Sequence, residues 1–482
     1  MPPRAADRPA LRAAIVLLAP ALLAGALVWR ATSEYGPGLS PDSMQFLAAA
    51  KNLAAGHGFR RVEGTPFVEW APLVPLLLTV VPARALGIAS AAGIAWAAGF
   101  WVFRRTRSMR VATMAAAAIA VSFPVIFVAS HLWSDAPFLF LALVGVLMLE
   151  RAREGRSVAL AAIPAALAAL TRYLGVTLIA AGIVTLLLER RPDRLRRAVL
   201  YGWLASLPLV LWLVRNVLAT GTATGDREPP GFSFATNVRQ LAHAVTADLV
   251  PWSWPGTIKL ALCAAALVGG WLLSRKGAKS VGPLMLFALF YALAVVIVAS
   301  VWGSDGIDVR LALPLFVALI ARAFIAGSRA RATWLAYALG ALALVWMGRS
   351  YIETRRHVDD YARGGVPGFN DVLWSSSPTL ARLRSEPPNG VVYSNAPEIA
   401  YVALGRDVRR SPRAHLFYAK DAAVPDLEEF HRALAREGPA TLAWFDDAGE
   451  NRFVTPPELA RSVAVEQVAR FDDGSLYFVS AR

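Results

Sequence analysis

Cysteine and charged residues are both scarce in this sequence. The 482 residues include a single cysteine, Cys263, which lies in an apolar run. A disulfide within the chain and a cysteine-ligated metal cluster are therefore excluded. Only 17% of the residues are Asp, Glu, Lys or Arg, and 56% are hydrophobic, whereas soluble proteins carry roughly a quarter charged residues. These proportions exclude a soluble globular enzyme, a disordered chain and a fibrous repeat, and they indicate a polytopic membrane protein.

The excess of positive charge, formally +15, is unevenly distributed along the chain. Residues 1–349 carry 33 basic and 15 acidic side chains, and residues 350–482 carry 16 and 19. The basic residues stand in short clusters between apolar runs, which is typical of the positive-inside rule rather than of nucleic-acid binding. We therefore expect membrane lipids, and no nucleic acid, among the partners.

The apolar runs predict a polytopic α-helical protein of about eleven membrane-spanning helices. The expected spans are 11–29, 87–103, 111–129, 136–150, 157–171, 173–188, 198–218, 257–274, 281–302, 311–327 and 332–349. When these spans alternate across the membrane, the basic clusters all fall on one side, which places the N-terminus in the cytoplasm. Residues 73–86 are apolar but short and bounded by proline, and they predict a helix at the membrane interface.

The composition divides the chain into two expected domains. Residues 1–349 form the transmembrane domain, with a first outer loop at 30–72 and a second large outer loop at 219–256. Residues 350–482 have the composition of a small soluble α/β domain, which the span count places outside the cytoplasmic (inner) membrane. Within it the pattern predicts three short strands and one amphipathic helix, at 391–393, 442–445, 476–479 and 426–436.

Several acidic residues are expected at the outer ends of the spans. Ionisable groups beside the hydrocarbon are costly unless they are paired or solvated, so they are candidates for function. Asp42 opens an expected helix at 42–55, where capping of that helix is the simple alternative. Four further residues are candidates for acceptor binding: Glu69, His131, Asp135 and Asp305. The structural alternatives for them are a solvated carboxylate at the rim, a helix cap, a turn residue or a local ion pair.

Three arginines stand at outer span ends, against the positive-inside trend. They are Arg172, which Tyr173 follows, Arg215 and Arg310. The simple explanation for each position is that the long side chain extends (snorkels) to the membrane interface. As a set they suit bidentate binding of an anionic group such as phosphate. We therefore take these arginines and Tyr173 as candidate phosphate-binding residues.

Six short motifs follow one another through the membrane part of the chain. They are Asp42-Ser43 with 50–59, 70–78, 131–135, 170–175, 212–216 and 310–314. Their order resembles the GT-C superfamily of polyprenyl-phosphate-sugar-dependent glycosyltransferases. The resemblance is greatest to the branch of protein O-mannosyltransferases and lipid A aminoarabinose transferases.

The resemblance implies that Asp42 is the carboxylate of the first outer loop, placed at the acceptor. The chain departs from the family pattern at Ser43, where many relatives have a second acid, and at Asp135, where the residue is often Glu. In the aminoarabinose branch a carboxylate resembling Glu69 helps to hold a metal. The resemblance thus offers a divalent-metal site at Asp42 and Glu69 as one option, with His243 as a guess for a further ligand.

Such a site suits transfer of a glycosyl group from a polyprenyl-phosphate donor to a lipid, glycan or protein acceptor at the outer face. The leaving phosphate needs fixed cations, such as Arg172 and Arg310. Asp42 would take the proton of the acceptor, and one displacement with one base predicts inversion at the anomeric carbon. Two alternatives stay open: a transporter or flippase for lipid-linked sugar or polysaccharide, and a non-catalytic scaffold.

Overall fold

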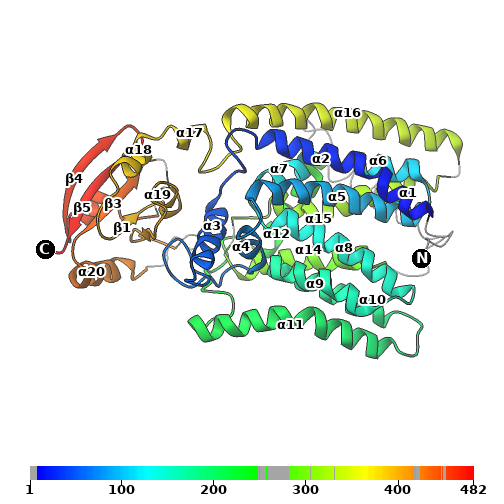
Figure 1. Ribbon diagram of the computed structural model, residues 1–482, viewed down its shortest axis with the longest axis horizontal. Helices are drawn as coiled ribbons and strands as arrows, with labels where there is room; N and C mark the ends of the chain where they lie inside the picture. Colours follow the sequence, from blue (N-terminus) through cyan, green and yellow to red (C-terminus); the bar gives the residue numbers. More distant parts are fainter. Residues whose placement is uncertain are drawn as a thin grey trace.

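The computed structural model describes residues 8–247, 249, 257–258, 282–303, 305–330, 332–416, 418, 424–446, 448 and 452–482. Cys263 and nearly all of the expected span 257–274 lie outside these residues. In Figure 1 a bundle of long helices forms one part of the molecule, and a smaller part with a β-sheet lies beyond one end of the bundle.

Helices occupy all ten expected span positions that the structure describes (Figure 1). They are α1 (Arg8–Val16) with α2 (Leu18–Ala31), α5 (Ala83–Thr106), α6 (Met109–Ala120) with α7 (Phe123–Ser130), α8 (Asp135–Arg153), α9 (Val158–Thr171), α10 (Val176–Leu187), α11 (Arg194–Thr220), α14 (Pro283–Val301), α15 (Val309–Gly327) and α16 (Thr333–Gly364). By length and composition, six described segments could each cross a membrane as one helix, or seven if α6 and α7, bent by 52°, form one span. The remaining helices are shorter or carry more charge, so the expected number of eleven stays a prediction.

The basic ends of α5 and α8 meet at the end of the bundle that lies far from the sheet (Figure 1). Arg105 in α5 pairs with Glu150 in α8 at 2.5 Å, and Arg104 pairs with Glu154. Both pairs join the C-terminal ends of the two helices, so α5 and α8 run in the same direction. Alternating spans require this, because α6 with α7 returns the chain between them. The other end of α8, where Asp135 begins the helix, lies toward the sheet.

The first outer loop contains a helix where the sequence predicts one. Helix α3 (Pro41–Ala54) matches the expected range 42–55, but its cap is not Asp42. Ser40 is the N-cap and forms a capping box with Ser43, in which each side chain bonds the backbone of the other residue. Pro41 takes the first helical position, where proline is favoured. Asp42 is therefore not needed for capping, and its carboxylate is available for other contacts.

The expected interfacial helix at 73–86 is divided in the structure. Helix α4 (Leu73–Leu78) has only six residues, and α5 begins at Ala83, directly after Pro82. Proline cannot continue the hydrogen bonding of a helix interior, so the break falls at this position. The prediction of one helix over the whole range is thus wrong at its C-terminal part, which belongs to α5.

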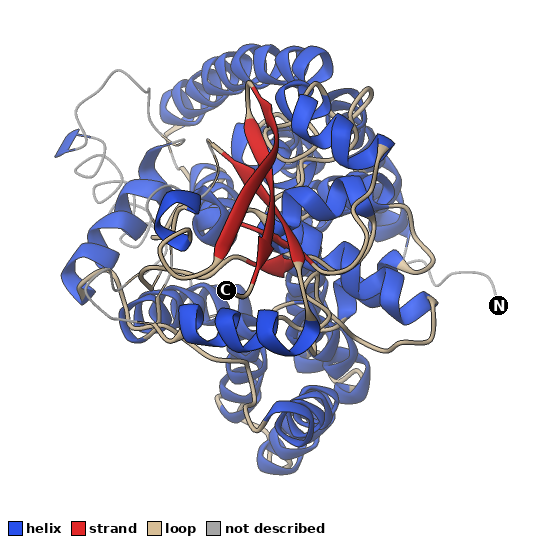
Figure 2. Cartoon of the chain, turned by 90° about the vertical axis from the view of Figure 1, so that its left-hand side faces the viewer, coloured by secondary structure: helices blue, strands red, loops and turns tan. Residues whose placement is uncertain are grey.

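A five-stranded mixed sheet forms the core of the C-terminal part (Figure 2). Its strands are β1 (Val392–Ser394), β2 (Arg409–Arg410), β3 (Ala440–Phe445), β4 (Ala464–Phe471) and β5 (Gly474–Ser480), in the order β2-β1-β3-β5-β4. Strand β1 is parallel to β2 and β3, and β5 is antiparallel to β3 and β4. Strands β1, β3 and β5 confirm the three predicted strands, and α20 (Asp426–Glu437) confirms the predicted helix.

The sequence did not reveal every element of this part. Strands β2 and β4 were not predicted, and neither were the short helices α17 (Val372–Ser375), α18 (Pro378–Ser385), α19 (Pro397–Leu404) and α21 (Pro456–Leu459). Strand β4 lies at the sheet edge and most of its residues are exposed, so it lacks a clear apolar pattern. Helix α16 continues through the expected domain boundary at residue 349 as far as Gly364.

Candidate active site

The loop before α3 is held by backbone contacts on two sides. On one side, the backbone of Gly38 exchanges hydrogen bonds of 3.0 Å with Ser130 and Leu132. On the other, the Asn370 side chain accepts from the backbone of Leu39 at 3.0 Å. A side chain at Gly38 would lie within 2.7 Å of the ring of His131, so only glycine fits. This fixed loop sets where α3 begins relative to α8.

Four charged side chains from four separate elements form a continuous chain of ion pairs. Arg310, at the start of α15, donates to Asp42 at 3.2 Å. Its Nε atom lies 3.7 Å from Asp135, at the start of α8. Asp135 also pairs with Arg172, which follows α9. The structure thus brings together four of the predicted site residues, although 268 positions separate Asp42 from Arg310. We name these four residues the outer cluster.

Asp135 is the buried centre of the outer cluster, with a side chain only 3% exposed. Within the described residues, neither of its carboxylate oxygens has a well-aligned hydrogen bond, and the same holds for Nη1 of Arg172 and Nε of Arg310. The contacts of Asp135 with the two guanidinium groups are therefore ionic rather than well-aligned hydrogen bonds. Asp42 is more accessible, because about a third of its side chain is exposed.

The ring of Trp133 packs against the guanidinium group of Arg310. The guanidinium carbon of Arg310 lies 4.3 Å from the centre of the Trp133 ring, a cation–π distance. His131 stacks on the Trp133 ring: the two ring centres are 3.9 Å apart and the rings are nearly parallel. Burial lowers the pKa of His131 to about 4, so the ring is neutral at pH 7. His131 is thus a positioning residue, and sequence reasoning missed Trp133.

Tyr173 and Arg215 contact a different region from Arg172 and Arg310. The hydroxyl of Tyr173 lies 2.8 Å from the carbonyl oxygen of Val68 and accepts from Trp212 at 3.1 Å. Arg215 donates to the carbonyl oxygen of Phe67 at 3.0 Å. Both side chains therefore hold the loop before α4, and we do not include them among the phosphate-binding residues.

Glu69 belongs to a second ionic network, which joins the first outer loop to the sheet domain. Glu69 pairs with Arg61, and Arg61 pairs with Glu63 at 3.2 Å. Arg410, in β2, lies 3.2 Å from Glu63 and 3.3 Å from Glu398 in α19. We name these five residues the docking network. The sequence could not reveal it, because about 350 positions separate its two halves.

Arg410 is the cation that the two carboxylates Glu63 and Glu398 of the docking network share. Burial acts to raise the pKa of Glu63, but Arg61 and Arg410 outweigh it, and the pKa is lowered. Burial raises the pKa of Glu398, against the opposing effect of Arg410. A carboxylate whose pKa is lowered by folding stabilises the fold above its ordinary pKa and loses this contribution as the pH falls.

Replacing Arg410 by methionine is expected to destabilise the docked sheet domain by about 3 kcal/mol at neutral pH. The change leaves buried Glu398 without its ion-pair partner and removes one of the two cations that contact Glu63. The loss should shrink toward pH 5 as those carboxylates take up protons. Thermal unfolding and limited proteolysis between pH 5 and pH 8 measure it. Arg432→Met, an exposed substitution in α20, is the control, and an equal effect of both variants would contradict this role.

The described residues do not assemble the metal site that the resemblance offered as an option. Among them, no group of three or more His, Cys, Asp or Glu side chains is placed to hold a metal ion. Asp42 contacts Arg310, whereas Glu69 contacts Arg61. We therefore derive no step through a metal.

Asp305 lies at a contact with the sheet domain. The Tyr418 hydroxyl donates to Asp305 at 3.1 Å, and the backbone of Tyr418 donates to Glu228 at 3.0 Å. The neighbouring Asp308 is the N-cap of α15 and accepts from the backbone of Arg310. A structural role thus accounts for both acids.

No protein-family model and no curated protein sequence matches this chain. Among solved structures, it is similar to the crystal structure of ArnT from Cupriavidus metallidurans bound to undecaprenyl phosphate. The TM-score is 0.59 over 96% of this chain and 97% of that chain, with 16% sequence identity. At this identity the likeness is one of fold. Together with the apolar helices, it shows that the chain has the architecture of a polytopic helical membrane protein.

Proposed function

We propose that this protein is an integral-membrane glycosyltransferase that moves a sugar from a polyprenyl-phosphate donor to an acceptor at the outer face of the inner membrane. The observation that carries the proposal is the outer cluster, in which Arg310 contacts both Asp42 and Asp135. The fold likeness to ArnT, a protein whose structure holds undecaprenyl phosphate, supports the class of donor. The motif order that resembles the GT-C superfamily supports the reaction.

In the proposed reaction, a hydroxyl or amine of the acceptor attacks the anomeric carbon of the donor sugar. The bond from this carbon to the phosphate oxygen breaks, and polyprenyl phosphate leaves with the bonding electrons. Asp42 takes the acceptor proton as the new bond forms. Because the displacement is single, the configuration at the anomeric carbon inverts.

The arginines of the outer cluster would stabilise the leaving phosphate. A guanidinium group has five N–H donors, and Arg310 uses Nη2 for Asp42 and Nε for Asp135. Within the part of the chain that the structure describes, Nη1 of Arg310 makes no hydrogen bond, and we assign it to donate to a phosphate oxygen. Fixed donors of this kind, aimed at developing charge, make a large contribution to catalysis. Asp135 holds both arginines in place and is a positioning residue.

The two parts of the chain have different roles in this proposal. Residues 1–349 carry the transfer site, and residues 350–482 form an outer domain that contacts the first outer loop through the docking network. The N-terminus would then be cytoplasmic. The acceptor is a lipid, a glycan or a protein.

The proposal is tested with purified protein in lipid nanodiscs, supplied with polyprenyl-phosphate sugars and outer-envelope acceptors. We expect release of polyprenyl phosphate that is matched mole for mole by glycosylated acceptor, with inverted anomeric configuration. A transporter would instead move the lipid-linked sugar across sealed vesicles without cleaving it. Movement without cleavage, or no turnover with any donor, would contradict the proposal.

A further inference from the structure

An apolar groove lies between α1, α5 and α8, far from the outer cluster. Its volume is about 330 Å³, within the range of ligand pockets. Nine residues line it: Ala10, Leu11, Ala14, Trp96, Phe100, Val144, Leu147, Met148 and Arg151. Arg151 is 16 positions after Asp135 in the same helix, which corresponds to about 24 Å along α8. The groove is therefore at the basic end of the bundle.

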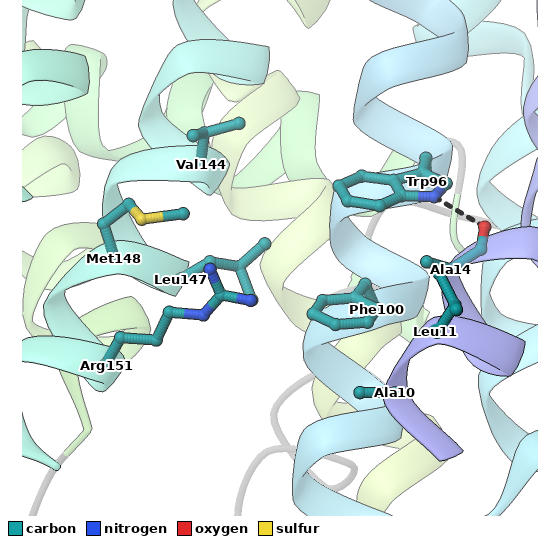
Figure 3. Close-up of a pocket in the computed structure, with 9 residues that line it drawn as sticks. All are labelled: Ala10, Leu11, Ala14, Trp96, Phe100, Val144, Leu147, Met148 and Arg151. Carbon is teal, nitrogen blue, oxygen red and sulfur yellow. Dashed lines mark hydrogen bonds between the residues drawn. The ribbon is translucent and has the colours of Figure 1, made fainter. Parts of the chain in front are cut away.

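The groove has fixed walls and opens onto the apolar outer surface. Trp96 and Phe100 stack with ring centres 5.3 Å apart, and Trp96 donates to the carbonyl oxygen of Ala14 at 3.0 Å, which holds α1 against α5 (Figure 3). On the outer side of α1, Leu11 and Ile15 are more than half exposed. An apolar chain in the groove would thus be continuous with the hydrocarbon around the bundle.

Arg151 is the charged residue of the groove. Figure 3 shows its side chain extending from α8 across the gap toward Phe100. The two glutamates close to it in sequence, Glu150 and Glu154, pair instead with Arg105 and Arg104 of α5. Arg151 has no ion pair or side-chain hydrogen bond within the described residues, and it is exposed. The groove therefore combines an apolar slot with one uncompensated positive charge.

We propose that this groove binds one acyl chain of an anionic phospholipid, whose headgroup Arg151 holds. Basic pockets between membrane helices recognise anionic headgroups in this way, and each basic side chain near the surface contributes about 1 kcal/mol. The inference does not depend on the proposed sugar transfer, because it involves neither Asp42 nor the arginines of the outer cluster.

Native mass spectrometry of the full chain, with phosphatidylglycerol and phosphatidylcholine in competition, tests this proposal. We expect wild type to prefer phosphatidylglycerol about fivefold, the factor that corresponds to about 1 kcal/mol. Arg151→Gln should abolish the preference while leaving thermal unfolding unchanged. Val144→Trp, which fills the groove and leaves Arg151 in place, should reduce the retention of both lipids.

Arg110→Gln is the matched control, since Arg110 is an exposed arginine at the start of α6 that does not line the groove. It should keep the preference for phosphatidylglycerol. Three results would overturn the proposal: an unchanged preference in Arg151→Gln, an equal loss in Arg110→Gln, or full lipid retention in Val144→Trp. The last result would show that hydrocarbon binds elsewhere on the bundle.

Discussion

Replacing Asp42 by asparagine is expected to lower the rate of polyprenyl phosphate release by about 10²- to 10⁴-fold, the usual contribution of a general base. Asparagine keeps the shape of the side chain but cannot take the acceptor proton. The fold should survive, because Ser40 and not Asp42 caps α3. The lost pair with Arg310 is partly exposed, so its contribution to stability is about 1 kcal/mol or less.

The measurement is single-turnover release of lipid phosphate by wild type and Asp42→Asn at equal, folded protein concentration. Glu34→Gln provides the control, since Glu34 is an exposed acid in the same outer loop and has no role in the reaction. We expect its rate to equal that of wild type. Undiminished release by Asp42→Asn would remove Asp42 from the mechanism.

Replacing Asp135 by asparagine is expected to destabilise the protein by about 3 kcal/mol or more. Asp135 is the buried anion between Arg172 and Arg310, and removing one partner of a buried ion pair leaves uncompensated charge. Both guanidinium groups would then move toward solvent, so release of polyprenyl phosphate should also fall. This variant therefore differs from Asp42→Asn, in which activity is lost and stability is kept.

Thermal unfolding in detergent measures the effect of Asp135→Asn on stability. The amounts of bound and released lipid phosphate are the second readout. Glu154→Gln is the matched control, because it removes the acid of an ion pair in which the carboxylate is 59% exposed. We expect that control to change the free energy of unfolding by less than about 1 kcal/mol. If Asp135→Asn were as stable as this control, Asp135 would not be the centre of the outer cluster.

Much of the helical architecture could be predicted from the sequence, since apolar length and basic clusters are local signals. The exceptions also have local causes. Pro82 divides the expected helix at 73–86, and the bend between α6 and α7 is not visible in hydropathy. Strand β4 lacks a strong apolar pattern because it lies at the sheet edge.

The candidate site could be predicted only in part. Charged residues at the outer span ends were recognisable, but their partners were not, because pairing depends on tertiary structure. Asp135 was assigned a capping or acceptor role, whereas it lies between two arginines. Arg215 was grouped with the phosphate-binding residues, whereas it holds the backbone of Phe67. The docking network joins residues from both ends of the chain and has no sequence signature.

Binding of polyprenyl phosphate to wild type and Arg310→Gln tests the central claim most directly, because it measures recognition of the leaving group without requiring the acceptor. Charge-assisted hydrogen bonds contribute about 1.5–3 kcal/mol, so we expect the dissociation constant to rise about 10- to 100-fold in Arg310→Gln. Arg84→Gln, which removes an arginine whose hydrogen bonds are to Thr32 and Trp29, should bind as wild type does. Equal affinity in all three proteins would contradict the assignment of the outer cluster as the phosphate-binding site.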